Sequence, residues 1–296
     1  MYEEHAVASL LEKPPIRRPK FSEHIMELPE ISILASQMMK ELSGKRISEV
    51  EVMNPKCLNM ALEQFYTSLV GRTIESVRAR GKWVFINLDD HYVLLFNSGM
   101  GADVTYVERG SPLTEKYHIR LGLDDGTGFT VRVWWFCYLH LLEAVGLGEH
   151  KLTTGMGLTP LDVDFTLDHF RQLLTGKRGK VKSFLLNQRN VAGIGNVYIQ
   201  DILFEARINP MRTVPSLTDA EVEALHRSMR AVLSESIRMG GLAYEKDFYS
   251  NKGGYGKEQF KVAYKPGEPC PICKKPVQKI RTGSTSSFIC PSCQPL

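Results

Sequence analysis

The feature that most constrains the fold of this chain is a pair of Cys-x-x-Cys motifs near its C-terminus. They are Cys270-Pro-Ile-Cys273 and Cys290-Pro-Ser-Cys293, with sixteen residues between them. Two such motifs supply the four thiolates of a tetrahedral zinc site, and the segment between them can form a small hairpin. A disulfide-stapled tail is the alternative, but it needs an oxidising compartment, and we recognise no secretory signal. The motifs therefore predict a structural Zn2+ site.

The bulk composition is typical of a soluble protein. The 296 residues are 43% hydrophobic and 24% charged, with a net charge of +4 and a pI of about 8.6. This length predicts two domains plus a zinc module, and the mild positive charge permits a polyanionic partner without requiring one. No apolar run approaches the length of a membrane span. Cys57 and Cys137 are expected to be small buried residues in a reducing cytoplasm.

Residues 1–25 differ in character from the rest of the chain. The proline-rich segment 14–20 cannot be a helix or a central strand and predicts an extended or disordered arm. Three glutamates in the first thirteen residues argue against a transit peptide. The alternative is that translation begins at Met26.

The next part of the chain predicts a mostly antiparallel β domain with a leading helix. Apolar residues recur at helical spacing from Ile31 to Leu42, and Gly44 ends that pattern. Strand-like runs follow, with turn signals at Asp89-Asp90 and in the segment 124–128. The predicted strands are 47–53, 73–78, 82–88, 92–97, 117–123 and 129–135.

After residue 160 the pattern becomes helical. Thr166 is expected to cap a helix that runs to Leu174, and Thr218 opens a capping box for a helix that extends to about Arg238. Further helical segments are predicted at 180–189 and 196–206. The stretch 246–262 is rich in Gly, Lys and Tyr and predicts a flexible loop.

A glycine-containing run lies between two of these helices. Two glycines flank Ile194 in Gly193-Ile-Gly195-Asn196, at the start of a predicted helix. Such a turn can present backbone amides to a phosphate, and Asn196 would add a side-chain donor. Taken alone, the glycines are explained better by a plain tight turn, so this motif by itself does not establish a function.

Four motifs in order carry a resemblance to a known family. They are Glu27-Leu-Pro-Glu30, Arg80-Gly-Lys82, Gly193-Ile-Gly-Asn196 and the four-cysteine unit. Together the residues from 26 to 296 resemble the formamidopyrimidine-DNA glycosylase and endonuclease VIII family. The resemblance implies an α+β multidomain fold with DNA between two domains. The implied parts are an arm (1–25), an N-terminal antiparallel β-sandwich of catalytic type with its leading helix (26–155), a helix–two-turn–helix domain (160–262) and a zinc finger (263–296).

The resemblance also implies a reaction. A base is flipped out of the duplex, the α-amine of the processed N-terminus attacks C1′ to form a Schiff base, and elimination then cleaves the strand. The catalytic residues implied are Met26 as a free N-terminus, Glu27 as general acid or base, and Lys82 on the phosphate beside the lesion. From the residues alone, Glu27 also fits a helix N-terminal acid and Lys82 a strand-edge charge.

DNA contacts are implied for eight residues, while four positions depart from the family pattern. Met26 is internal and replaces the usual proline, Thr285 replaces an arginine of the zinc hairpin, and Asp201 replaces a glutamate. An aromatic run replaces the usual wedge that fills the vacated stack, although a buried strand end is an alternative explanation of that run. The predicted DNA-binding residues are Gly193, Gly195, Asn196, Lys182, Arg281, Trp134, Trp135 and Phe136.

The prediction is therefore a DNA repair protein that excises an oxidised base from damaged duplex DNA, with or without AP-lyase strand cleavage. A non-catalytic protein that binds damaged DNA or abasic sites is the alternative. A zinc-ribbon interaction module would leave the Gly193–Asn196 turn unexplained. We expect a monomer that acts on the chromosome in the cytoplasm, without a membrane.

Overall fold

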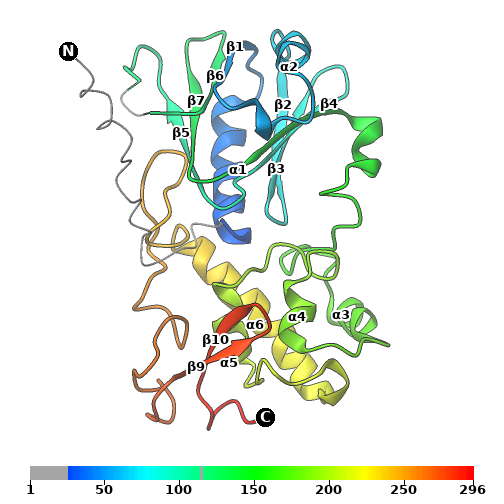
Figure 1. The fold of residues 1–296 in the computed structure, drawn as a ribbon, viewed down its shortest axis with the longest axis vertical. Helices are drawn as coiled ribbons and strands as arrows, with labels where there is room; N and C mark the ends of the chain where they lie inside the picture. The colour runs from blue at the N-terminus through cyan, green and yellow to red at the C-terminus, as the bar shows by residue number, and fades with distance from the viewer. Residues whose placement is uncertain (1–25, 114–115) are drawn as a thin grey trace, which may run out of the picture.

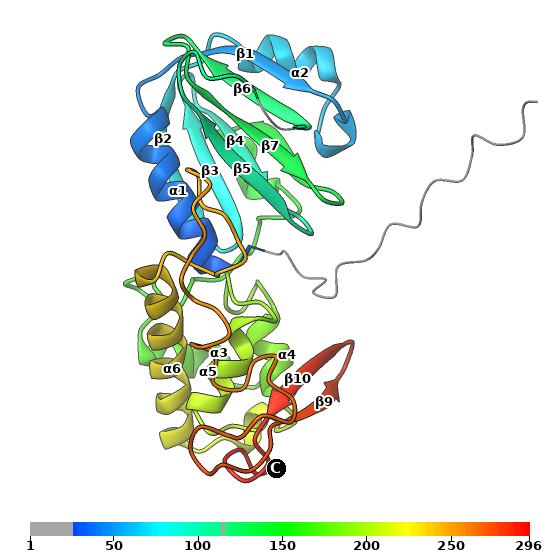
Figure 2. The ribbon, with the colours of Figure 1, turned by 90° about the vertical axis from the view of Figure 1, so that its left-hand side faces the viewer.

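The computed structural model of the protein describes residues 26–113 and 116–296. The arm predicted for residues 1–25 lies outside these described residues. A β-sandwich forms one end of the molecule, and helices with a small hairpin form the other (Figures 1 and 2). The fold class predicted from the resemblance, an antiparallel sandwich with a leading helix, a helical part and a zinc finger, is confirmed.

The sandwich consists of two four-stranded antiparallel sheets. The first has the order β1 (Ile47–Val52), β6 (Ile119–Leu123), β7 (Gly128–Val133), β5 (Ala102–Val107). The second has the order β2 (Ile74–Arg80), β3 (Trp83–Leu88), β4 (Tyr92–Asn97), β8 (Tyr138–Glu143). Two short elements, η1 (Pro55–Cys57) and α2 (Leu62–Leu69), connect β1 to β2, and η2 (Ala144–Glu149) follows β8.

Six of these strands match the predicted runs, whereas β5 and β8 were not predicted. Both lie at sheet edges, and each bonds to a partner that is distant in sequence. Tyr92 of β4, for example, pairs with Glu143 of β8. Because such strands are stabilised by long-range pairing, their local sequence gives only a weak signal.

Helix α1 (Leu28–Leu42) joins the two ends of the molecule. It packs along β2 and also contacts α6. Ile31 belongs to the sandwich core, whereas Leu28 belongs to the core of the helical part. The first turn of α1 therefore lies where the two cores meet (Figure 1).

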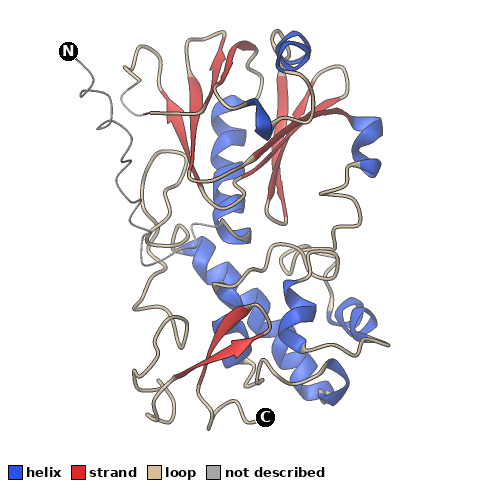
Figure 3. Ribbon diagram, viewed as in Figure 1, coloured by secondary structure: helices blue, strands red, loops and turns tan. Residues whose placement is uncertain are grey.

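The helical part contains α3 (Leu167–Leu174), α4 (Val181–Leu186), α5 (Tyr198–Glu205), the short η3 (Val214–Ser216) and α6 (Asp219–Arg238). The predicted caps are present: Thr166 accepts a hydrogen bond from the amide of His169, and Thr218 and Glu221 form the capping box of α6. Loops connect these helices, as the secondary-structure colouring shows (Figure 3).

The segment 246–262, predicted to be a flexible loop, contains no helix or strand but is packed. Phe248 is fully buried in the sandwich core, where its ring lies 5.4 Å from that of Tyr106. Tyr255 and Phe260 pack in the helical core. Asp201 accepts hydrogen bonds from three successive amides at residues 261–263, at 2.9–3.0 Å. Flexibility is therefore the wrong description, because long-range burial orders a segment whose local sequence is rich in turn residues.

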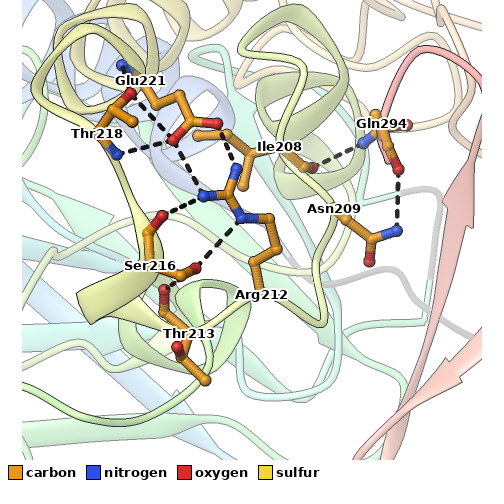
Figure 4. A network of polar contacts seen from close by, with 8 residues as sticks. All are labelled: Ile208, Asn209, Arg212, Thr213, Ser216, Thr218, Glu221 and Gln294. Atoms are coloured by element: carbon orange, nitrogen blue, oxygen red, sulfur yellow. Dashed lines mark hydrogen bonds and ion pairs between the residues drawn. The ribbon is translucent and has the colours of Figure 1, made fainter. Parts of the chain in front are cut away.

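The C-terminal module is a two-stranded hairpin, β9 (Gln278–Thr282) and β10 (Thr285–Ile289), flanked by the cysteine pairs. Gln294 attaches it to the helical part, donating to the carbonyl of Ile208 and accepting from the amide of Cys290. Asn209 donates in turn to the carbonyl of Gln294 (Figure 4). Beside these contacts, Arg212 pairs with Glu221 of the α6 capping box.

Among the described residues, no helix is long and apolar enough to cross a membrane.

Candidate active site at the start of helix α1

The site is built around the carboxylate of Glu27, which immediately precedes α1. Its side chain is 1% exposed. One oxygen accepts a hydrogen bond from the amide of Gly195 at 2.7 Å, and the other accepts from the amide of Val197 at 2.9 Å. The turn between α4 and α5 therefore holds the carboxylate in a fixed orientation, across the junction between the two parts of the molecule.

Two glycines make this close approach possible. A Cβ at Gly195 would lie 2.2 Å from Glu27 Oε1 and 2.4 Å from Lys82 Nζ. Gly193 has a φ of +94°, and a Cβ there would lie 2.7 Å from the Cβ of Leu28. Its carbonyl also accepts a hydrogen bond from the Leu28 amide at 3.0 Å. Any larger residue at these positions would push the turn away from α1.

Lys82 brings a cation to the same point. It lies between β2 and β3, directly after Gly81, whose φ is +58°. A Cβ on Gly81 would lie 2.7 Å from the sulfur of Met156. The backbone carbonyl of Lys82 accepts a hydrogen bond from Asn97 at 2.7 Å. This backbone is therefore held from both sides, with the ammonium group beside the Glu27 carboxylate.

A second buried carboxylate, Glu30, supports the first. One of its oxygens accepts from the amide of Glu27 at 3.1 Å. The other accepts from the Tyr198 hydroxyl at 2.6 Å and from the Leu242 amide at 3.1 Å, and the Tyr198 hydroxyl also bonds to Ser236. Sequence reasoning had singled out Glu30 only as part of a motif. Its bonds now link α1, α5 and α6 beneath the site.

The electrostatic environment keeps protons on both carboxyl groups at higher pH than usual. Burial raises the pKa of Glu27, opposed by the charge of Lys82 and by the backbone hydrogen bonds it accepts. Burial raises the pKa of Glu30 to about 7, against the hydrogen bond from Tyr198. Perturbed carboxyl groups of this kind are typical of sites that transfer protons.

The amides of both glycines in the Gly193–Asn196 turn have acceptors within the protein. Gly193 donates to the side chain of Gln188 at 2.8 Å, and Gly195 donates to Glu27. The expectation that these two amides face a phosphate is therefore wrong. The turn instead orients an acidic side chain. Asn196 is half-buried, and its side-chain oxygen accepts from Gln200 at 3.2 Å.

Lys182, predicted to contact DNA, is buried between α4 and the zinc hairpin. Its side chain is 1% exposed. The ammonium group donates to Thr285 Oγ1 at 3.0 Å, to the Ser286 carbonyl at 2.8 Å and to Ser287 Oγ at 2.9 Å. Thr285 is the position where the resemblance leads one to expect arginine. A phosphate would reach this lysine only if the hairpin moved, so in this structure its bonds hold the hairpin tip.

We expect Lys182→Met to loosen the hairpin tip. The substitution keeps the buried stem but removes a charged donor, and a hydrogen bond to a charged group contributes about 1.5–3 kcal/mol. Amide hydrogen exchange at residues 284–287 should accelerate by about tenfold or more. Lys279→Met, at an exposed lysine of β9, is the matched control and should leave exchange unchanged. Equal exchange in the two variants would show that Lys182 does not hold the tip.

The four cysteines converge as their spacing predicts. Their sulfur atoms all lie within 4.8 Å of one another, with Cys270 and Cys293 at 3.8 Å and Cys273 and Cys290 at 3.3 Å. Four thiolates at a Zn–S distance of about 2.3 Å would be separated by about 3.8 Å in a tetrahedron. The donor set and its geometry therefore fit a structural zinc ion.

The aromatic run lies on an exposed loop between β7 and β8. The exposed fractions of Trp134, Trp135 and Phe136 are 46%, 77% and 43%. The Arg132 guanidinium lies 5.0 Å from the centre of the Trp134 ring. The alternative of a buried strand end is therefore wrong. Large exposed aromatic groups are uncommon on a surface without a binding role, and their contact with DNA stays a prediction.

Arg281, the remaining predicted DNA-binding residue, is exposed on β9. Its Nε donates to the carbonyl of Gly283 at 3.2 Å. This bond lies within the hairpin turn, so the guanidinium belongs to the same module as Thr285. Arg281 therefore belongs to the zinc hairpin and not to the cluster around Glu27.

Comparisons with known proteins agree with this architecture. The model of the formamidopyrimidine-DNA glycosylase N-terminal domain matches residues 25–132, the formamidopyrimidine-DNA glycosylase H2TH domain matches 156–247, and the zinc finger found in FPG and IleRS matches 267–296. The formamidopyrimidine-DNA glycosylases of Desulforamulus reducens and Chloroflexus aurantiacus are each 32% identical to this chain. These matches cover 90% of this chain and 98% and 97% of the two relatives. The chain belongs to the formamidopyrimidine-DNA glycosylase family.

Solved structures of the family superpose on nearly the whole described fold. Lactococcus lactis Fpg in complex with DNA that contains N7-benzyl-Fapy-dG gives a TM-score of 0.83 at 27% identity. This match covers 91% of this chain and all of the other. The same protein with abasic-site DNA gives 0.82. Family membership makes this chain a DNA repair glycosylase of the glycosylase/AP-lyase class with a structural zinc finger.

Proposed function

We propose that this glycosylase performs its chemistry where Met26 and Glu27 meet Lys82 and the Gly193–Asn196 turn. The observation that carries the proposal is the buried Glu27 carboxylate, held by the amides of Gly195 and Val197 with Lys82 beside it. An acid and a cation fixed together in this way suit a reaction that moves protons near a phosphodiester.

Met26 supplies the nucleophile in this proposal, through its α-amine when it is the first residue. An α-amino group has a pKa of about 7.7–8.0, so roughly a third is neutral at pH 7.5, against about 0.1% of an ordinary lysine. The neutral amine attacks C1′ of the flipped nucleotide and displaces the base, and opening of the sugar ring at the C1′–O4′ bond then gives the Schiff base. With residues 1–25 attached the nitrogen is an amide, which is not nucleophilic.

Glu27 acts as the general acid and base of this sequence. It donates a proton as the glycosidic bond breaks and accepts one during the steps that form the Schiff base. Lys82 binds the phosphate next to the lesion and thereby sets the position of C1′ relative to the amine. Elimination from the Schiff base then cleaves the sugar strand on its 3′ side.

The partner is damaged double-stranded DNA. Asn196 and Arg281 contact its phosphates, the Gly193 and Gly195 turn keeps the carboxylate oriented, and Lys182 supports the hairpin that carries Arg281. Trp134, Trp135 and Phe136 fill the space left by the flipped base, because base–aromatic stacking tolerates any sequence. The DNA ligands of the structural relatives make a formamidopyrimidine lesion and an abasic site the first substrates to test.

We further propose that the protein acts as a monomer on the chromosome in the cytoplasm. The functional units proposed are 26–155, 160–262 and 263–296, after an arm at 1–25. A non-catalytic protein that binds lesions is the second candidate, favoured by methionine in place of proline at position 26.

Borohydride trapping distinguishes the two candidates. Chains that begin at Met1 and at Met26 are each incubated with a duplex that contains an abasic site, and borohydride is added. We expect a covalent protein–DNA complex from the Met26 form only, because only that form has a free α-amine at residue 26, next to Glu27. Trapping by neither form, together with no release of a formamidopyrimidine base, would support the binding-only function. Equal trapping by the Met1 form with a blocked N-terminus would assign the nucleophile to another amine.

A further inference from the structure

Two cysteines outside the zinc module lie together beneath the exposed aromatic loop. Cys57 is the last residue of η1, and Cys137 directly follows Phe136. Their exposed fractions are 8% and 4%, and the Cys57 thiol donates a hydrogen bond to the carbonyl of Asn54 at 3.1 Å. Neither residue ligates the zinc site, and eighty positions separate them in sequence.

The backbones that carry these thiols are held close by their neighbours. Leu58 and Leu139 form a parallel β-bridge. The side chain of Asn59 donates to the carbonyl of Leu141 and accepts from its amide, both at 2.9 Å. The segment after η1 therefore lies against the start of β8, which brings the backbones that carry Cys57 and Cys137 side by side.

The pair is accessible from a small cavity. The cavity has a volume of about 160 Å³ and is lined by both cysteines, by the three aromatic residues of the loop and by His118. A molecule the size of hydrogen peroxide fits in this space. Its walls connect the thiols directly to the loop that carries Trp134 and Trp135.

The two thiols are not equivalent. The interaction with Cys137 lowers the pKa of Cys57, whereas the same interaction, together with burial, raises the pKa of Cys137. A thiolate is the form that attacks a peroxide, and Cys57 is also the more exposed of the two thiols, so Cys57 is the attacking residue and Cys137 the resolving one.

We propose that Cys57 and Cys137 are a redox-sensitive pair that a peroxide converts to an intramolecular disulfide, which restrains the Trp134–Phe136 loop. The Cys57 thiolate attacks one oxygen of hydrogen peroxide, forming a sulfenic acid, and the other oxygen leaves as hydroxide and takes up a proton to give water. The Cys137 sulfur then attacks the sulfenic sulfur, forming the S–S bond and releasing a second water. Two thiols lose two electrons, and one peroxide gains them.

The disulfide would act on the loop because Cys137 is continuous with it. Phe136 is already confined on its other side, since a Cβ on Gly99 would lie 2.1 Å from its carbonyl oxygen. The Trp134 amide bonds to the carbonyl of Gly101 at 3.0 Å. A covalent link at Cys137 would remove much of the remaining freedom. Its effect on DNA rests on the proposed function of the loop.

The covalent step is tested on the full-length zinc-loaded protein, first reduced and then treated with equimolar hydrogen peroxide. We expect peptide mass spectrometry to find a Cys57–Cys137 cross-link, zinc content to stay unchanged, and the cross-link to be absent in Cys137→Ser. Two free, alkylatable thiols at these positions after treatment, or disulfides only among the zinc ligands, would overturn the proposal.

The effect of the disulfide on the Trp134–Phe136 loop is measured first without DNA and then with DNA. Acrylamide quenching of tryptophan fluorescence should decrease on oxidation in the wild type but not in Cys57→Ser or Cys137→Ser, because two of the three tryptophans lie in the loop. Affinity for an abasic duplex should fall by about tenfold, the size of one lost stacking contact, and recover with a thiol reductant. Unchanged quenching in a cross-linked protein would overturn the coupling. If quenching decreases on oxidation as expected but the reduced protein does not bind the abasic duplex, the result would contradict the proposed function and not the redox pair.

Discussion

Glu27→Gln is expected to reduce base release by a factor of about 10²–10⁴ while the protein still binds damaged DNA. Glutamine keeps the shape of the side chain but has no proton to donate as an acid. It also turns an NH2 group toward one of the amides of Gly195 and Val197, so one of them loses its acceptor. That loss costs about 1–3 kcal/mol of stability, and we expect the protein to stay folded because the other buried contacts of α1 are unchanged.

The measurement is single-turnover release of a formamidopyrimidine base, alongside the dissociation constant for an abasic duplex. Glu63→Gln, at an exposed glutamate of α2, is the matched control and should behave as wild type. A Glu27→Gln protein that releases base at the wild-type rate would exclude Glu27 from the reaction.

The same residue should shape the pH dependence of base release. Burial raises the pKa of Glu27 above the 4.5 of a free glutamate, so the acid form persists to higher pH. Base release that needs this acid falls as pH rises through the raised pKa, and Glu27→Gln should lose that dependence. The free energy of unfolding depends on pH with the same sign. Because the folded state binds the Glu27 proton up to a higher pH than the unfolded chain does, the contribution of Glu27 to stability decreases as pH rises from the unfolded-state pKa to the folded-state pKa.

Cys290→Ser is expected to abolish zinc binding and to unfold the C-terminal module. Structural zinc sites contribute about 10–16 kcal/mol in isolated finger peptides, far more than a two-stranded hairpin can gain from its own packing. Zinc content should fall from one ion per chain to none. Amide exchange across residues 267–296 should become fast, and affinity for damaged DNA should fall by at least tenfold, because Arg281 and the hairpin lose their position.

The helical core should survive this change, because it is built from α3 to α6 and the packed segment 239–264. Far-UV circular dichroism should therefore remain largely intact. Cys57→Ser is the control, since it removes a thiol that is not a zinc ligand. Full zinc occupancy in Cys290→Ser would show that the four sulfurs are not the binding set.

Local patterns predicted most of the secondary structure. The capping residues Thr166 and Thr218, the helical spacing in α1 and the turn signals around Asp89 and Asp124 act within a few residues, so the sequence displays them directly. The edge strands β5 and β8 escaped prediction because their stability comes from distant partners. For the same reason the packed segment 246–262 was mistaken for a flexible loop.

The predictions for the site also succeeded where the signal is local and were incomplete where it depends on distant segments. The four zinc ligands and their tetrahedral geometry could be predicted, because each Cys-x-x-Cys motif places two sulfurs on the same ion. Glu27 and Lys82 were identified through a resemblance, and their proximity depends on a turn that lies 168 positions from Glu27. The burial of Lys182 under Thr285 had no sequence signal, since a lysine on a short helix is normally exposed.

By itself, then, the sequence determined the zinc module, the order of the structural parts and the family. These properties reside in the spacing of neighbouring residues. Only the tertiary structure decided that the Gly195 amide binds an acidic side chain instead of a phosphate, that Lys182 supports the hairpin, and that Cys57 meets Cys137. Each of these contacts joins segments whose separation depends on how the sandwich, the helices and the hairpin pack. Packing of this kind depends on many residues that are far apart in the chain, so no short segment of the sequence predicts it.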